Sequence, residues 1–357
     1  VVRFWVSEFD VDGIRLDAAD VLDFGFMHEL RMLANEIKPE FWLMGEVIHG
    51  DYSRWVNPDM LHSVTNYQLY KALYSGHNEH NYFEIAHTVR YLLDKGNLPY
   101  HLYNFVDNHD VERIYTRLLN KQEFVPVHIL MYTLPGIPSI YYGSEFGIEG
   151  RKEKHSDAVL RPAINLEDYS NALNENGCTN IIVRLGEIRQ KNPVFTDGIY
   201  QELRLTNRQY AFARTNEITQ AIVVVNNDEV DSSLDIPANG TYTELLSGEI
   251  QTVEGNLHVH LRACSGQIWM RDYDETVVKE TEVKIPEIKQ VEVKEETIKQ
   301  VTVDHSKSYE EMSIEELQAC VLEKLAKNGP VTEQMKRDVA NNVYHDSLVN
   351  WIKSFRN

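Results

Sequence analysis

The sequence has few cysteines, no long apolar run and a shortage of basic residues. Its three cysteines, Cys178, Cys264 and Cys320, are too few and too scattered for a disulfide framework or a zinc site. No stretch approaches the ~20 consecutive apolar residues that a membrane helix needs. Lys and Arg number 35 against 55 Asp and Glu, which gives a net charge of −20. This charge argues against nucleic acid and anionic membranes as partners and fits a neutral substrate.

The chain begins with Val1, not Met, inside an apolar-periodic run that continues to Val6. No helix cap or leader precedes this run. We therefore expect the chain to be truncated at its N-terminus, which would remove any signal for its location in the cell. On the sequence that remains, a cytoplasmic location is favoured.

Short apolar runs alternate with helical patterns through the first 192 residues. We expect strands at 9–17, 41–44, 63–67, 101–106 and 136–143, and helices over 1–9, 24–37, 81–95, 111–132 and 176–192. This alternation predicts βα units around a parallel sheet. Five strands without closing partners would leave unpaired edges, so either half of a barrel is missing or the sheet is open.

The pattern changes twice after residue 192. Over 193–272, apolar and polar residues alternate between turn signals such as Asn239-Gly240, which predicts a small antiparallel β domain. Residues 273–305 are charged and lack glycine, so we expect an extended linker. Ser313 and Glu316 form a capping-box pattern within 306–357, which predicts a helical appendage. This appendage could pack on the barrel or mediate self-association into a homo-oligomer.

Three short carboxylate-bearing stretches, 12–20, 45–47 and 107–110, each follow an apolar run. Acids at the carboxyl ends of successive parallel strands converge over one mouth of a barrel. Cleavage of a glycosidic bond needs this set of groups: a carboxylate that attacks, a carboxylic acid that protonates the leaving oxygen, and charge that stabilises the oxocarbenium ion. The three stretches therefore predict a catalytic site at that mouth.

Asp17 is the strongest candidate for the nucleophile. The alternation in 14–17 places Arg15 and Asp17 on one strand face, where a guanidinium keeps a carboxylate ionised and oriented. Glu46 follows an apolar strand, and poor solvation there favours the neutral form that a general acid needs. A structural Arg–Asp pair and a loop or helix-capping carboxylate are the alternatives.

His109 and Asp110 end the fourth expected strand, where polar groups at this density need hydrogen-bond partners or a ligand. A metal site competes with this interpretation, but no second His lies at ligand spacing. Aromatic residues near the strands could stack on sugar rings, although such residues usually belong to the core: Trp42, Tyr67, Tyr103, Tyr141 and Tyr142.

Taken together and in this order, the three motifs and the later stretch 136–145 resemble the α-amylase family of glycoside hydrolases (family 13). The stretches 45–49 and 66–67 are similar to its cyclomaltodextrinase and neopullulanase subgroup. The resemblance covers about residues 1–271. It implies the C-terminal half of a (β/α)₈ TIM barrel over 1–192, followed by an antiparallel β-sandwich over 193–272.

The resemblance also implies a role for each matching residue. Asp17 would be the nucleophile, Glu46 the acid/base, and Asp110 the third acid, which distorts the sugar and stabilises the transition state. Arg15 would orient Asp17, and His109 would hydrogen-bond the sugar at the cleavage point. The implied reaction is retaining hydrolysis of α-1,4-glucosidic bonds in maltooligosaccharides, cyclodextrins or starch-derived glucans, with no redox or nucleotide cofactor.

Two departures from the family pattern limit these implications. Ser144 lies where many members carry Asp, and the family's first strands, early Asn-His motif and loop domain have no counterpart here. Those parts often hold calcium, so a Ca²⁺ site is left open for the full-length protein, and this chain alone is expected to have little or no activity. Two other functions remain: a transglycosylase, in which a sugar hydroxyl replaces water, and a catalytically silent sugar-binding member.

Overall fold

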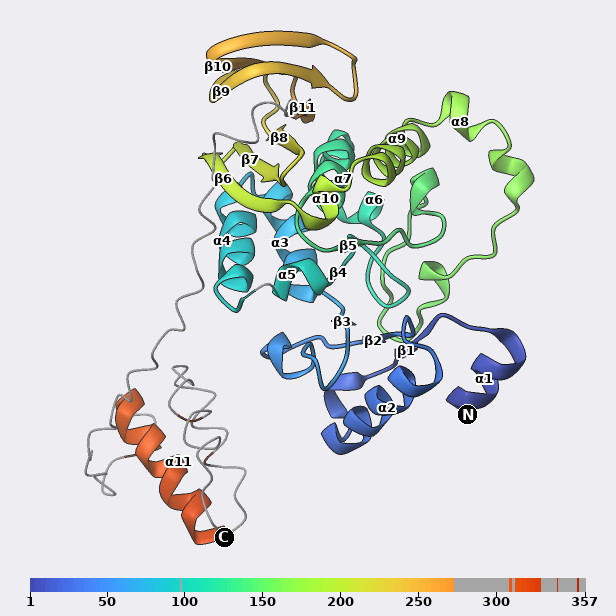
Figure 1. The fold of residues 1–357 in the computed structure, drawn as a ribbon, viewed down its shortest axis with the longest axis vertical. Coiled ribbons are helices and arrows are strands. Elements are labelled where there is room, and N and C mark those ends of the chain that lie inside the picture. The colour runs from blue at the N-terminus through green and yellow to red at the C-terminus, as the bar shows by residue number, and fades with distance from the viewer. Residues whose placement is uncertain (97, 273–307, 310–311, 329–338, 340–351, 353–357) are drawn as a thin grey trace. The chain divides into compact units, whose positions relative to one another are not determined.

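The computed structural model describes residues 1–96, 98–272, 308–309, 312–328, 339 and 352. The chain divides into two compact units, Val1–Glu282 and Val283–Asn357, and each unit is described by itself. Figure 1 shows the course of the chain through both units. No helix among the described residues is both long and apolar enough to cross a membrane.

Five short parallel strands form the framework of the first 192 residues. They are β1 (Gly13–Leu16), β2 (Trp42–Gly45), β3 (Ser63–Val64), β4 (Tyr103–Asn104) and β5 (Ile137–Pro138). β2 pairs with β1 and β3, β4 pairs with β5, and one bridge between Thr65 and Tyr103 joins the two sheets. Spatial order thus follows chain order, and helical segments lie in the connections. The predicted parallel βα arrangement is confirmed.

Helices precede, connect and follow these strands along the chain (Figure 1). They are α1 (Val2–Phe9), α2 (Phe24–Ile37), α3 (Tyr67–Asn78), α4 (Tyr82–Leu93), α5 (Leu98–His101), α6 (Ile114–Arg117), α7 (Phe124–Thr133), α8 (Ala172–Glu175), α9 (Gly177–Lys191) and α10 (Val194–Asp197). α2 begins where the Asp23 side chain accepts a hydrogen bond from the Phe26 N–H. It buries Met27 and Leu30 and ends before Pro39, which matches the predicted range.

The strand predicted over 63–67 is shorter than expected, and a helix follows it that the sequence analysis did not predict. The Asn66 side chain accepts a hydrogen bond from the Leu69 N–H at 3.1 Å and so caps α3. The chain therefore becomes helical at Tyr67. This cap places Tyr67 three residues after β3, whereas Asp17 and Glu46 follow β1 and β2 directly.

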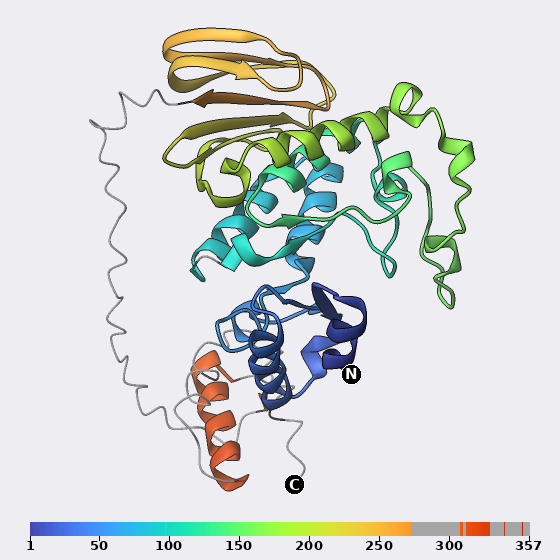
Figure 2. The same ribbon diagram turned by 45° about the vertical axis from the view of Figure 1, so that its right-hand side comes forward.

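The second part of the first unit is antiparallel, as predicted. Its strands are β6 (Ile199–Leu205), β7 (Gln209–Thr215), β8 (Thr219–Asn226), β9 (Ser232–Glu244), β10 (Ile250–Leu261) and β11 (Ser265–Asp272). They form one hydrogen-bonded sheet in the order β10-β9-β11-β8-β7-β6. The long β9–β10 ribbon folds back over the remaining strands and encloses an apolar layer that includes Ile222, Tyr242, Leu257 and Trp269 (Figure 2). The two layers of the predicted sandwich are thus parts of one continuous sheet.

The opposite face of this sheet packs on helices of the first part. Phe212 on β7, Val223 on β8 and Ile268 on β11 share one apolar cluster with Leu130 on α7 and Leu185 on α9. All five side chains are almost completely buried. The βα part and the β domain therefore share a core, and burial of these side chains stabilises both together.

The second unit contains α11 (Ile314–Asn328). The Glu316 N–H donates to the Ser313 hydroxyl at 3.2 Å, and the Ser313 N–H donates to the Glu316 carboxylate at 2.8 Å, so the predicted capping box is confirmed. Leu317 and Val321 belong to a small apolar core of this unit. The predicted linker over 273–305, and most of the predicted appendage after residue 328, lie outside the described residues.

Candidate active site at the carboxyl ends of the parallel strands

Arg15 joins the first two acids of the site. In the parallel pairing of β1 with β2, Leu16 lies opposite Gly45, so the residues that follow the two strands are neighbours. Arg15 Nη1 contacts Asp17 Oδ1 at 3.0 Å, and Arg15 Nη2 contacts Glu46 Oε2 at 2.8 Å. The positive charge of one guanidinium thus offsets the mutual repulsion of two carboxylates. The side chain of Asp17 is 80% exposed, whereas that of Glu46 is 10% exposed.

Glu46 is buried at the strand mouth, as expected, but it is not short of partners. Its carboxylate accepts hydrogen bonds from the Ala18 N–H at 3.3 Å and from the Tyr67 hydroxyl at 3.4 Å, in addition to the Arg15 contact. A guanidinium, a backbone N–H and a phenol hydroxyl therefore all contact this carboxylate. Glycine is required at position 45, because a Cβ atom there would lie 2.5 Å from the Leu61 side chain.

Tyr67 connects the first acids to the third. Its hydroxyl donates to Glu46 and accepts a hydrogen bond from Asn108 Nδ2 at 3.1 Å. Burial raises the pKa of Tyr67, the Asn108 hydrogen bond opposes this shift, and the negative charges of Glu46 and Asp110 add to it. The phenol is therefore a proton donor that lies near both carboxylates.

Asp110 is held from several directions. Arg161 Nη2 contacts Asp110 Oδ1 at 2.7 Å, and Arg161 Nε donates to the His109 carbonyl at 3.0 Å. His109 Nε2 lies 3.1 Å from Asp110 Oδ2, so both oxygens of the carboxylate have partners. Lys152 Nζ donates to the backbone carbonyl of Asp110 at 2.5 Å.

The residues predicted from the sequence thus lie in two clusters. Arg15, Asp17 and Glu46 are in direct contact, and His109 and Asp110 form the second cluster. Tyr67 and Asn108 link the clusters, and neither had been assigned this role from the sequence. The available signal was position, since Tyr67 lies three residues beyond the carboxyl end of β3.

Asp107 lies beneath the second cluster and is 2% exposed. Its Oδ2 accepts hydrogen bonds from the Ile114 N–H at 2.8 Å and from the Ser144 hydroxyl at 2.7 Å, whereas its Oδ1 has no hydrogen-bond partner among the described residues. Burial raises the pKa of Asp107 to about 6, against the lowering effect of these bonds and of the Arg113 charge. This carboxyl group therefore changes charge in the mildly acidic range.

No group of three or more His, Cys, Asp or Glu side chains within the described parts of the chain could hold a metal ion. Within the described residues, His109 and Asp110 therefore have no third such side chain beside them that could complete a metal site. Asp110 instead takes its positive charge from Arg161.

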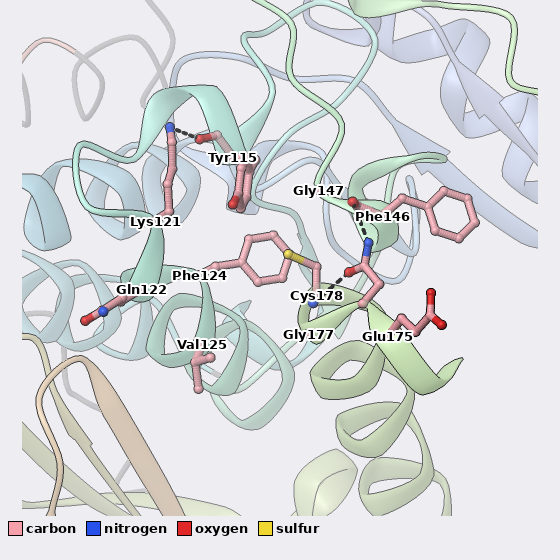
Figure 3. Close-up of a pocket in the computed structure, with 11 residues that line it drawn as sticks. Tyr115, Lys121, Gln122, Phe124, Val125, Phe146, Gly147, Glu175, Gly177 and Cys178 are labelled. Carbon is pink, nitrogen blue, oxygen red and sulfur yellow. Dashed lines mark hydrogen bonds between the residues drawn. The ribbon is translucent and has the colours of Figure 1, made fainter. Parts of the chain in front are cut away.

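A pocket of about 460 Å³ lies away from the acids (Figure 3). It is lined by Tyr115, Lys121, Gln122, Phe124, Val125, Phe146, Gly147, Glu175, Asn176, Gly177 and Cys178. Its polar groups serve the fold: Lys121 Nζ donates to the Leu118 carbonyl at 2.9 Å, and Asn176 Nδ2 donates to the Phe146 carbonyl at 3.0 Å. None of the site residues predicted from the sequence lines this pocket.

Comparison with known proteins gives the same division of the chain. Residues 1–183 match the family model described as the alpha amylase catalytic domain, and residues 204–291 match the one described as its C-terminal all-beta domain. Neopullulanase 2 of Thermoactinomyces vulgaris is 30% identical over 280 residues, which cover 75% of this chain and 46% of that protein. A cyclomaltodextrinase of Thermoanaerobacter pseudethanolicus is 29% identical over 64% of this chain and 39% of its own length.

Two further proteins extend this comparison. The intracellular maltogenic amylase of Bacillus subtilis is 30% identical over 64% of this chain and 39% of its own length. The crystal structure of an Anoxybacillus α-amylase superposes with a TM-score of 0.67 at 22% identity, covering 76% of this chain and 61% of that chain. The chain thus spans less than half the length of the sequence relatives that it matches.

Proposed function

Because the chain belongs to the α-amylase family, whose catalytic-domain model matches residues 1–183, we propose that the protein is a retaining glycoside hydrolase of α-1,4-glucosidic bonds. Its substrates would be maltooligosaccharides, cyclodextrins or starch-derived glucans. The observation that carries this proposal is the pair of carboxylates, Asp17 and Glu46, bound to one guanidinium at the ends of adjacent parallel strands. Active sites of such barrels lie at this end of the strands.

In the proposed first step, an Asp17 carboxylate oxygen attacks the anomeric carbon while the bond to the leaving oxygen breaks. Glu46, in its protonated form, donates a proton to that oxygen. In the second step Glu46 removes a proton from water, the water oxygen attacks the anomeric carbon, and Asp17 leaves as a carboxylate. This double displacement needs the two carboxyl groups ~5–5.5 Å apart.

The remaining residues would bind and orient the sugar. Arg15 orients Asp17 and Glu46 through its two contacts. Asp110 and His109 present a carboxylate and an imidazole to the sugar hydroxyl groups, in a geometry held by Arg161. Tyr67 keeps a hydroxyl proton directed at Glu46.

Hydrolysis of maltotriose by the full-length protein and by matched Asp→Asn variants of it tests this proposal, because this chain alone is expected to have little or no activity. We expect glucose and maltose as products, with the anomeric configuration retained in proton NMR of the freshly released sugar. Asp17→Asn should lower the rate at least ~1,000-fold, because the nucleophile is lost. Asp12→Asn is the control, since Asp12 pairs with Lys38 on the surface and should leave the rate unchanged.

The outcomes separate the proposal from its rivals. Longer oligosaccharides as the main products would mean transfer to a sugar acceptor. Turnover that survives in Asp17→Asn, or inversion of configuration, would refute the assigned nucleophile. Binding of maltotriose without cleavage would favour a silent sugar-binding member.

We also propose a cytoplasmic location for this activity. The support is the name of a relative, the intracellular maltogenic amylase of Bacillus subtilis. Fractionation of cells that produce the protein tests this, and recovery from the medium or the membrane fraction would contradict it.

A further inference from the structure

Arg113 is buried beneath the site and touches two other segments of the chain. Its guanidinium lies 4.1 Å from the ring centre of Tyr141. Nη1 donates to the Tyr142 carbonyl at 2.6 Å, and Nη2 donates to the Leu160 carbonyl at 2.8 Å. One side chain thus ties the loop after β4, on which it sits, to the loop after β5 and to the segment that leads into Arg161.

A hydroxyl group connects the same guanidinium to a buried acid. Ser144 Oγ accepts a hydrogen bond from Arg113 Nη1 at 3.2 Å and donates one to Asp107 Oδ2 at 2.7 Å. Asp107 also accepts a hydrogen bond from the Ile114 N–H, the residue next to Arg113. Asp107, Ser144 and Arg113 are each 2% exposed or less, so this chain of polar contacts is closed to solvent.

These buried contacts bear directly on Asp110. Arg161 follows Leu160, whose carbonyl Arg113 binds, and Arg161 itself contacts the Asp110 carboxylate at 2.7 Å. Asp110 precedes Arg113 by three residues on the same loop. We propose that Arg113 is a positioning residue for Asp110: by binding the segments on both sides, it sets the orientation in which Asp110 and Arg161 meet. This inference deepens the proposed function and rests on it.

The arrangement is unfavourable as a device for stability alone. A buried guanidinium loses its hydration, and its Nε has no hydrogen-bond partner within the described structure. A planar fork reaches acceptors on several segments at fixed angles, which a lysine ammonium cannot do. The benefit of this costly group is geometric, because it fixes the relative positions of loops that carry site residues.

Two variants separate positioning from folding. Ser144→Ala removes the hydroxyl between Arg113 and Asp107. Arg113→Lys keeps the positive charge but removes the planar guanidinium. Ser75→Ala is the matched control: the Ser75 hydroxyl is also nearly buried and also donates to a carboxylate, that of Glu84 at 2.6 Å, but it lies on α3 away from the acids. The full chain is used for all three variants.

The first measurement is the ¹⁵N NMR signal of the His109 imidazole, whose Nε2 lies 3.1 Å from Asp110 and reports that contact. The second is the affinity for maltotriose by titration calorimetry. We expect Ser144→Ala and Arg113→Lys to shift the His109 signal and to weaken maltotriose binding about three- to tenfold, the effect of one or two lost hydrogen bonds. Ser75→Ala should change neither.

The two readouts distinguish failure of this inference from failure of the proposed function. A His109 signal identical in wild type, Ser144→Ala and Arg113→Lys would overturn the positioning role, whatever the change in melting temperature. Wild-type protein that does not bind maltotriose would count against the proposed function, while the His109 signal would still decide the role of Arg113. If Arg113→Lys bound maltotriose as tightly as the wild type, the positive charge alone would be sufficient. That result would also overturn the inference.

Discussion

Two buried glutamates, one in each part of the first unit, have opposite surroundings. Glu244, at the end of β9, accepts hydrogen bonds from the backbone N–H groups of Leu246, Ser247 and Ile268 at 3.1, 2.6 and 2.9 Å. Glu123, immediately before α7, is equally buried at 1% exposure. Within the described residues, neither of its carboxylate oxygens has a hydrogen-bond partner.

The difference reflects what each architecture offers a buried charge. The turn between β9 and β10 leaves backbone donors free of the sheet, and Glu244 takes them. Within the described residues no such donor reaches Glu123, and His80 Nδ1 lies 3.7 Å from its Oε1, beyond hydrogen-bond distance. Burial raises the pKa of Glu123 to about 7. The β domain thus supplies three backbone donors to its buried carboxyl group, whereas the βα part holds a carboxyl group that resists ionisation.

The same substitution at the two positions should have opposite effects, and the larger effect is expected at Glu244. Glu244→Gln replaces one acceptor oxygen with an amide that faces backbone donors. We expect a loss of about 2–4 kcal/mol in the free energy of unfolding at pH 7, measured by urea denaturation. A loss below the error of that measurement would mean that the three hydrogen bonds make no net contribution to the free energy of unfolding. The expected difference between Glu244 and Glu123 would then be absent.

Glu123→Gln should stabilise the protein, and the gain should depend on pH. The pKa of Glu123 is raised from 4.5 to about 7, so the neutral form adds stability below pH 4.5 that the wild type loses as the pH rises towards 7. The glutamine variant lacks this contribution of position 123 to the loss. We expect it to exceed the wild type by about 2–3 kcal/mol at pH 8 and to match it near pH 4. An equal difference in stability at both pH values would show that ionisation of Glu123 does not cause the pH dependence.

Asp107→Asn tests a carboxyl group of intermediate character, with one bonded and one free oxygen. Its pKa is raised from 3.8 to about 6, so the wild type should lose stability between these values and the variant should not. We expect the variant to be about 1–2 kcal/mol more stable at pH 7.5, because the hydrogen-bonded oxygen is kept. A less stable variant would mean that the charge of Asp107 outweighs its burial through the nearby Arg113.

The smallest effect is expected at an exposed carboxylate of the β domain. Asp235 pairs with His258 on the β9–β10 ribbon, and both side chains are more than half exposed. Asp235→Asn should change the free energy of unfolding by less than about 0.5 kcal/mol at pH 7. A larger loss would show that surface ion pairs, as well as the buried Glu244, contribute to the stability of the β domain.

Local signals predicted most of the elements. α2 begins and ends as predicted because a capping Asp23, apolar spacing and Pro39 all act within one stretch of sequence. The Ser313–Glu316 capping box was predicted for the same reason. The start of α3 was missed because Asn66 reads equally well as a strand residue or a helix cap. Its own amide group donates to Asn104, 38 residues further along the chain.

The part of the site that depends on neighbouring residues in the sequence could be predicted, and the rest could not. Contact between Arg15 and Asp17 follows from alternation within one strand, which a sequence contains. Contact between Arg15 and Glu46 depends on the register of β1 against β2, and the hydrogen bond from Tyr67 to Glu46 depends on where α3 starts. These are tertiary features, and no spacing along the chain encodes them. The catalytic roles of the acids stay predictions.

The single bridge between Thr65 and Tyr103 has a consequence for the spacing of the acids. Glu46 follows a strand on one side of this junction, and Asp110 follows a strand on the other. The junction is closed by the amide pair Asn66–Asn104 at 2.9 Å, so its width sets how far apart the two carboxylates stand. We expect a bulkier side chain at either asparagine to widen this junction and to move Glu46 and Asp110 further apart.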